Sequence, residues 1–281
     1  MPSGDRYEYC VFSKHLSWLS VDELGEALAE IGFDGADLAV RPGGHVEPEH
    51  VTSDLPVAVE TLAKRGISCP MIVTNITEPS EQAEQVIKAA AEAGVRYYRM
   101  GYLHYGESIH ASLEEHRRRF HRLADLNERY GIHGAYQNHM GTWVGSPVWD
   151  LHDLLSGLNT KAIGCQYDVR HAAIEGGRSW PLGMRALAER IRCIVVKDGT
   201  WRTREDGSVG PVSVPVGSGM VDWELFRSIL SHSAFEGTLS VHYEFPLFSE
   251  DPEALEPAER TEKTIVAMRE ELERVKKLLE A

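Results

Sequence analysis

Apolar positions recur along the chain in two alternating patterns, one typical of a helix and one typical of a buried strand. Ser20 and Glu23 form a capping box, and the helix that it opens carries apolar residues at helical spacing: Leu24, Ala27, Leu28 and Ile31. Gly32 ends this helix, and residues 33–38 then have the pattern of a strand. The same order of helix, glycine and strand returns at intervals of about 28 to 37 residues, the size of one βα unit, at Gly66, Gly94 and Gly131.

Eight segments have the composition of buried strands, and helical segments fall between them. We place the strands near residues 7–12, 35–38, 68–74, 97–102, 134–138, 163–168, 193–197 and 238–244. This alternation predicts an α/β protein, a single-domain (β/α)8 TIM barrel across residues 1–281 that a long amphipathic helix at 260–279 closes. The alternative is an open doubly wound sheet, which often carries a Gly-rich dinucleotide turn, but the chain contains no GxGxxG.

Polar side chains stand where four of the predicted strands end. They are Gln137, Asn138 and His139 after the fifth strand, Asp168 and His171 after the sixth, Lys197 and Asp198 after the seventh, and His242 and Glu244 after the eighth. Because the carboxyl ends of barrel strands share one face, we expect these side chains to form one site. Carboxylates and imidazoles can serve there as metal ligands or as acid and base. The alternative is that each begins an ordinary polar loop.

Other strands and loops supply groups that suit a polar ligand. Substrate-binding candidates are Lys14 and His15 after the first strand, Arg41 and His45 after the second, Arg99 in the fourth, and Trp143 after the fifth, together with Asn138 and Asp198. Basic groups such as Arg41 bind a carboxylate or a phosphate, although they can equally pair with a neighbouring acid. Trp143 is one of several tryptophans near these loops, and indole faces stack on sugar rings.

Two later segments each allow two interpretations. Residues 201–216 are long, polar and contain glycine and proline, so they form either a flap over the strand ends or a surface excursion. Residues 216–223 then turn into a helix for which Asp222 is the expected cap. The backbone at Gly217 and Gly219 either cradles a phosphate or makes a tight turn, and we favour the turn.

Charge and composition narrow the class of protein. A net charge of -14 argues against a nucleic-acid surface, and no apolar run is long enough to span a bilayer. The N-terminal residues lack the pattern of a signal peptide. The cysteines lie far apart with no CxxC pair, and we expect buried free thiols in a reducing cytoplasm.

Short motifs follow one another along nearly the whole chain. They are GFDG at 32–35, QNH at 137–139, YDVRHA at 167–172, VKD at 196–198, GSGMVDW at 217–223 and GTLSVH at 237–242. With these motifs the chain resembles the sugar phosphate isomerase/epimerase family of xylose-isomerase-like TIM barrels. The resemblance implies a divalent metal at the carboxyl end of the barrel, held by Glu, Asp, His and Glu from strands five to eight.

The match to that ligand set is partial. The resemblance implies Mn, Zn, Co or Mg, with Gln137, Asp168 and His242 as the ligands that remain. Gln137 stands where the family has a glutamate, so it offers a neutral oxygen and no general base. Val195 stands where the family has a histidine, and it cannot bind a metal. A rebuilt metal site and a metal-free site are therefore both open.

Lys197 is the other unusual residue of this set. It lies two residues after Val195, on the same face of the strand, and we expect it to point into the barrel. An ammonium there repels a metal, but it can hold an oxyanion or act as a base. The alternative is a structural ion pair with Asp198.

The resemblance implies an enzyme that isomerises or epimerises a sugar or keto-sugar by moving a proton next to its carbonyl. The partners that it implies are a small polyhydroxylated substrate and further copies of the same chain in a homo-oligomer. Candidate catalytic residues are Glu244, Lys197, His171 and His139, with a metal or Lys197 stabilising the oxyanion. The first alternative is a keto-sugar lyase or dehydratase, which begins with the same proton abstraction. The second is a sugar-binding relative that has lost the chemistry.

Overall fold

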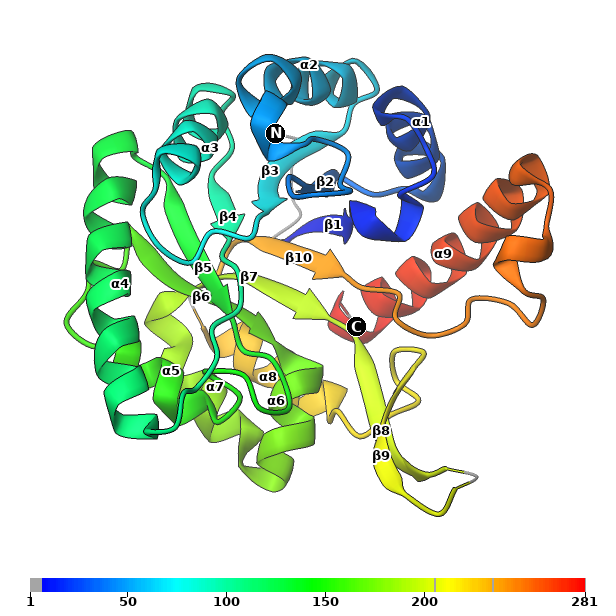
Figure 1. The fold of residues 1–281 in the computed structure, drawn as a ribbon. Coiled ribbons are helices and arrows are strands. Elements are labelled where there is room, and N and C mark those ends of the chain that lie inside the picture. Colours follow the sequence, from blue (N-terminus) through cyan, green and yellow to red (C-terminus); the bar gives the residue numbers. More distant parts are fainter. Residues whose placement is uncertain (1–6, 205, 234, 281) are drawn as a thin grey trace.

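A closed barrel of eight parallel strands forms the centre of the protein. The computed structural model describes residues 7–204, 206–233 and 235–280. Within them the barrel strands are β1 (Glu8–Phe12), β2 (Gly35–Ala39), β3 (Ser68–Val73), β4 (Tyr97–Arg99), β5 (His133–Gln137), β6 (Ile163–Asp168), β7 (Ile191–Val196) and β10 (Thr238–Val241). They pair in sequence order, and β10 closes the barrel between β7 and β1 (Figure 1). The predicted (β/α)8 barrel and its eight strand positions are confirmed.

Helices surround the barrel on its outside (Figure 1). They are α1 (Val21–Ile31), α2 (Val51–Lys64), α3 (Glu81–Glu92), α4 (Ile109–Tyr130), α5 (Val148–Leu155), α6 (Val169–Gly176), α7 (Trp180–Leu187), α8 (Trp223–His232) and the closing α9 (Pro257–Glu280). Short 3-10 turns lie between them, among them η1 (Ser13–Leu16) directly after β1. No described helix is long and apolar enough to cross a membrane.

The start and end of α1 show how the sequence sets these boundaries. The Ser20 side chain accepts a hydrogen bond from the Glu23 N–H, and the Glu23 carboxylate accepts one from the Ser20 N–H, as the capping box predicts. Gly32 ends the helix at φ 98°, a left-handed conformation that costs glycine little. The apolar face of Leu24, Ala27, Leu28 and Ile31 is buried against the barrel.

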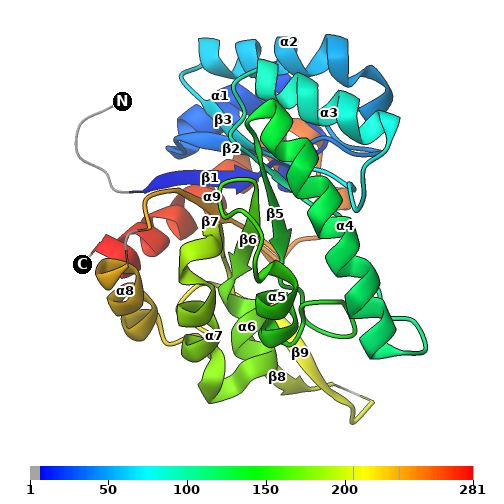
Figure 2. The same cartoon turned by 90° about the vertical axis from the view of Figure 1, so that its left-hand side faces the viewer.

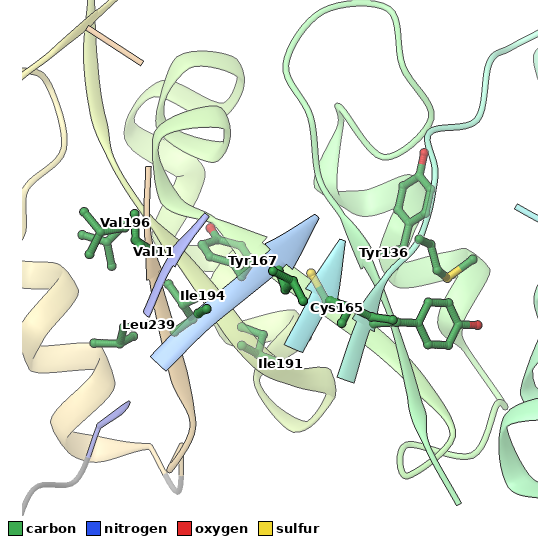
Figure 3. Close-up of a cluster of buried hydrophobic side chains, with 14 of the residues drawn as sticks. Val11, Tyr136, Cys165, Tyr167, Ile191, Ile194, Val196 and Leu239 are labelled. Atoms are coloured by element: carbon green, nitrogen blue, oxygen red, sulfur yellow. The ribbon is translucent and has the colours of Figure 1, made fainter. Parts of the chain in front are cut away.

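Strand side chains alternate between two cores. Those that point outward pack under the helices, and Figure 3 shows Val11, Tyr136, Cys165, Tyr167, Ile191, Ile194, Val196 and Leu239 among them. Those that point inward include a small apolar cluster of Met71, Ala135 and Cys193, which fills the barrel. The described cysteines, Cys10, Cys69, Cys165 and Cys193, are buried free thiols, as predicted. The last inward-pointing residues of the strands lie at the carboxyl end of the barrel, and many of them are polar.

A two-stranded hairpin leaves the barrel directly after β7. Its strands are β8 (Asp198–Thr203) and β9 (Val209–Val214), paired from Asp198 with Val214 to Thr203 with Val209. In both ribbon views the hairpin runs away from the barrel (Figures 1 and 2). Trp201 and Val209 are 47% and 62% exposed. Of the two interpretations of residues 201–216, the structure agrees with the surface excursion.

Candidate functional site

The polar residues predicted at four strand ends lie together at the carboxyl end of the barrel. Gln137 ends β5, Asp168 ends β6, Lys197 follows β7 directly, and Glu244 lies three residues after β10. Gln137 Nε2 donates to Asp168 Oδ2 at 2.8 Å. Lys197 Nζ lies 3.0 Å from Asp168 Oδ2 and 3.1 Å from Glu244 Oε2. Side chains from four strands therefore form one connected polar network.

Lys197 is the centre of this network. Its side chain is 3% exposed, and its two carboxylate partners differ, because Asp168 is fully buried while Glu244 is 36% exposed. The second oxygen of Asp168 caps α6 by accepting the His171 N–H at 2.9 Å. Both oxygens of Asp168 are thus held by the protein, and Glu244 is the carboxylate that a ligand can reach. The alternative ion pair of Lys197 with Asp198 is wrong.

Both carboxylates are held in the ionised form. Burial would raise the pKa of the Asp168 carboxyl, but Lys197 and the hydrogen bond from the His171 N–H outweigh burial, and the pKa is lowered. Burial would likewise raise the pKa of Glu244, but His242 and Lys197 bring it well below its usual range. The network therefore joins two ionised carboxylates through the side chain of Lys197.

Two neutral imidazoles lie beside the network. The Nδ1 of His171 is 3.0 Å from the Asn138 carbonyl oxygen, so this nitrogen carries the hydrogen and Nε2 carries the lone pair. Burial sets the pKa of His171 well below its usual value. The ring of His139 lies 4.2 Å from that of His171, and burial lowers its pKa as well. Both rings are therefore neutral at neutral pH.

His242 and His15 form a second imidazole pair over Phe12. His242 Nδ1 is 3.9 Å from Glu244 Oε1, and its Nε2 is 3.9 Å from Asp37 Oδ2, so neither contact is a hydrogen bond. His15 accepts the Tyr243 N–H at 3.1 Å, which fixes its ring 5.9 Å from that of His242. Burial, with His242 nearby, lowers the pKa of His15 to about 3.

Tyr102 is a member of the site that the sequence reasoning missed. Its hydroxyl donates to Gln137 Oε1 at 2.6 Å, and Arg99 Nη1 donates to the Tyr102 oxygen at 3.1 Å. Its ring also packs 4.8 Å from His139 and 5.2 Å from Trp143, so Trp143 does reach this wall. The signal that could have identified it is its position: Tyr102 is the last residue of the predicted fourth strand, and polar residues at the ends of the later strands were predicted to form the site.

Lys14, Arg41 and His45 lie on the opposite side of the mouth, around a cavity. The cavity has a volume of about 340 Å³, and its other lining residues are Ser17, Ala39, Pro42, Gly43, Gly44 and Asn75. Arg41 also lies over the Phe12 ring, with its guanidinium carbon 5.2 Å from the ring centre. Phe12 therefore connects this cavity to the His242 side of the network.

Two predicted substrate-binding residues are bound to the protein's own backbone. The Asn138 amide donates to the Asp168 carbonyl oxygen and accepts from the Asp168 N–H, at 3.0 and 2.8 Å, so it joins β5 to β6. The Asp198 carboxylate accepts from the N–H groups of Gly199 and of the turn at 217–221, and from Trp223 Nε1 at 2.9 Å. Both side chains are 1% exposed, and we assign them structural roles in place of substrate binding.

The same contacts settle the turn before α8. Gly217 and Gly219 both donate their N–H groups to Asp198 Oδ2 at 3.0 Å, so these donors already serve an internal carboxylate. Asp222 then caps α8 by accepting the Leu225 N–H, as expected. The tight turn is the interpretation that agrees with the structure, and these amides are not a phosphate cradle.

The side chains present do not fit the divalent metal that the family resemblance implies. Among the described residues no group of three or more His, Cys, Asp and Glu side chains is arranged to hold a metal ion. Of the predicted ligands, Gln137 directs its amide nitrogen at Asp168, and the ammonium of Lys197 lies between Asp168 and Glu244. A fixed positive charge at that point opposes a second cation.

Comparisons with known proteins agree with this architecture. The family model of xylose isomerase-like TIM barrels matches residues 26–278. Similar solved structures include the D-allulose 3-epimerase from Methylomonas sp., with 14% identity and a TM-score of 0.69 over 99% of this chain and 100% of that one. A probable 3-DHS dehydratase from Bacillus anthracis has 13% identity and a TM-score of 0.69 over 93% of this chain and 97% of that one. A 3-keto-D-glucoside 4-epimerase from E. coli has 12% identity and a TM-score of 0.67 over 93% of this chain and 98% of that one.

At such identities these structures establish the fold alone, and no curated protein sequence gives a significant match. The family model, in contrast, spans most of the chain, and the structure is a closed barrel of parallel strands. The chain therefore belongs to the xylose isomerase-like TIM barrel family.

Proposed function

We propose that this protein is an isomerase or epimerase of a sugar or keto-sugar, which moves a proton at the carbon next to the carbonyl. The observation that supports it most is Lys197 between Asp168 and Glu244, at the mouth of the barrel. A positive group beside a partly exposed carboxylate is what an enediolate intermediate requires: a base to take the proton and a cation to hold the oxygen. The structures that resemble this fold include proteins named as sugar epimerases.

Glu244 is the proposed base, and substrate binding restores its basicity. In the free protein Lys197 and His242 help to keep the pKa of Glu244 low, which makes it a weak base. When the substrate oxygen takes the hydrogen bond of Lys197, the Glu244 carboxylate loses that partner and its affinity for a proton rises. Asp168 stays ionised, keeps its contact with Lys197 and holds the ammonium in place for the developing oxyanion.

His171 and His139 are the proposed partners for the second proton transfer. Both rings are neutral, and the Nε2 lone pair of His171 is free to accept a proton because its Nδ1 hydrogen is directed at Asn138. In isomerisation, Glu244 returns its proton to the neighbouring carbon, while the imidazole moves the proton of the substrate hydroxyl group to the oxygen of the former carbonyl. In epimerisation, an imidazole that has taken a proton from the solvent gives it to the opposite face of the same carbon, and Glu244 releases its proton to the solvent. A lyase or dehydratase shares the first step and expels a hydroxyl group or an aglycone instead.

The test is hydrogen exchange at the carbon next to the carbonyl. The protein is incubated in D2O with a panel of ketoses, aldoses and 3-keto-sugars, and proton NMR follows loss of the adjacent C–H signal and the appearance of products. We expect exchange with at least one class of substrate. Glu244→Gln and Lys197→Met should each lower its rate by at least about 100-fold, the usual effect of removing a general base or an oxyanion donor.

Lys88→Met and Glu92→Gln are the matched controls, because these two residues carry the same charges on the exposed face of α3, 56% and 65% exposed. Both should exchange at the rate of the unmodified protein. Elimination products would select the lyase. Sugar binding without exchange in the unmodified protein would contradict an enzymatic role and favour a binding protein. Unchanged exchange in Glu244→Gln would remove that residue as the base.

A further inference from the structure

The cavity beside the proposed reaction centre is lined by positive charge. Lys14, on η1, and Arg41, after β2, both line it, and no carboxylate is among the lining residues. None of the ion pairs in the described ranges involves Lys14, Arg41 or the neighbouring Arg99. In a chain of net charge -14, three cations without an ion-pair partner lie on one side of one site, and this arrangement favours the binding of an anionic ligand.

Arg99 strengthens this positive region from below. It is 4% exposed, its Nε is buried without a hydrogen-bond partner, and its Nη1 donates to the neutral oxygens of Tyr102 and Gln137. Its guanidinium carbon lies 5.7 Å from the Phe12 ring centre, and that of Arg41 lies 5.2 Å from the same centre. Two guanidinium groups that share one ring in this way repel each other, and a bound anion removes that repulsion.

The positive region and the catalytic network are in contact. Arg99 reaches Gln137 Oε1 at 3.3 Å, and Gln137 in turn donates to Asp168. On the other side, the Phe12 ring under Arg41 lies 5.1 Å from His242. A small molecule whose carbonyl end is at Lys197 can therefore extend along Phe12 toward Arg41 and Lys14. The cavity of about 340 Å³ has room for a compact polar group.

We infer that the substrate is an anionic sugar derivative, with a carboxylate or a phosphate that binds Arg41 and Lys14 beside Arg99 while its carbonyl binds Lys197. This inference rests on the proposed function for the carbonyl end. Guanidinium groups suit this role because they bind planar and tetrahedral oxyanions through paired N–H donors. Ser17 and Asn75, which also line the cavity, supply neutral polar groups around the anion.

The test compares three unreactive ligands that share one polyol chain: sorbitol, D-gluconate and sorbitol 6-phosphate. Isothermal titration at low ionic strength is run on the whole protein and on Arg41→Ala, with Arg202→Ala as the control. Arg202 is an exposed arginine on β8, away from the cavity lining. At least one of the two anions should bind tenfold or more tightly than sorbitol, and the stronger one identifies the acid group.

Arg41→Ala should lower the affinity for that anion at least tenfold and leave sorbitol unchanged, while Arg202→Ala should behave as the unmodified protein. Equal binding of all three ligands, or anion binding that survives Arg41→Ala, would overturn the inference. Glu244→Gln separates the anion site from the proposed function, because this variant should lose the exchange reaction and keep anion binding. If no carbonyl compound exchanges but Arg41-dependent anion binding persists, the proposed function is wrong and the anion site stands. If carbonyl compounds exchange but neither anion binds more tightly than sorbitol, the proposed function stands and the anion site is wrong.

Discussion

Lys197 is buried between the carboxylates of Asp168 and Glu244, and each of the three charges is stabilised by its neighbours. Taking these charges out of water is costly, and the cost is offset only while all three are present. Lys197→Met leaves Asp168 fully buried without its cation, so we expect a loss of about 3 to 5 kcal/mol in the free energy of unfolding at pH 7. Urea denaturation measures it, with the exposed Lys88→Met, expected within about 0.5 kcal/mol, as control.

The reason for that loss can be checked with a second substitution. In Lys197→Met/Asp168→Asn the unpaired buried charge is gone, so the double variant should recover most of the stability. Lowering the pH should also reduce the deficit of Lys197→Met, because protonation neutralises Asp168. A double variant as unstable as the sum of the single ones would show that the ion pair does not carry the effect.

At the residue scale the sequence located the site but not its internal pairing. Asp168, Lys197, Glu244 and Gln137 could be placed together because parallel strands present their carboxyl ends on one face. Which charge pairs with which depends on side-chain directions across the mouth. Lys197 points inward to Asp168, whereas Asp198, one residue later, points the other way to the 217–221 turn.

At the scale of elements, the turn before α8 is built on a single carboxylate. That carboxylate belongs to Asp198, and a Cβ at position 219 would lie only 2.1 Å from Asp198 Oδ1. Gly219→Ala must therefore displace Asp198, and we expect a loss of about 1 to 3 kcal/mol, as for overpacking in a core. Gly106→Ala is the control, because the nearest atom to its Cβ would be at 3.5 Å.

Thermal or urea unfolding of the two glycine variants measures the difference. Gly106→Ala should be close to the unmodified protein, and Gly219→Ala clearly below it. Equal stability of the two variants would mean that Asp198 does not hold the turn in the way described.

Element positions followed from the sequence because their signals are local. Helix caps such as Ser20 and Asp222, and left-handed glycines such as Gly32, act within a few residues of themselves. The hairpin of β8 and β9 was not predicted, although Asp206 and Gly207 are an Asp-Gly pair of the kind that turns a hairpin, and Gly207 has φ 80°. Its pairing is fixed in part by Asp198, whose partners lie about twenty residues further along.

At the scale of the whole molecule, several histidines are buried in the neutral form, and this sets the response to acid. Burial lowers the pKa of His133 to about 4, and it also holds the pKa of His171 well below its usual value. An unfolded histidine has a pKa near 6.5, so between about pH 4 and 6.5 the unfolded state binds more protons than the folded state. Stability is therefore full above pH 6.5 and falls as the pH decreases.

For His133, which is 4% exposed, that difference amounts to about 2 kcal/mol lost between pH 7 and pH 5. Urea denaturation across this range should show a steeper decline for the unmodified protein than for His133→Gln, whose side chain does not titrate. The exposed His121→Gln is the control and should keep the full slope. Identical slopes for all three proteins would contradict the assignment of a neutral buried imidazole at His133.

At the carboxyl end of the barrel, where the family resemblance implies a divalent metal, the Lys197 side chain lies between Asp168 and Glu244 instead. The most direct measurement is the metal content of protein purified without chelator and then dialysed against Mn, Co or Zn, alongside Asp168→Ala. We predict no stoichiometric metal in the unmodified protein and no effect of chelator on the exchange reaction. Near-stoichiometric metal that Asp168→Ala abolishes would contradict the account, because Asp168 would then be a metal ligand and not the partner of Lys197.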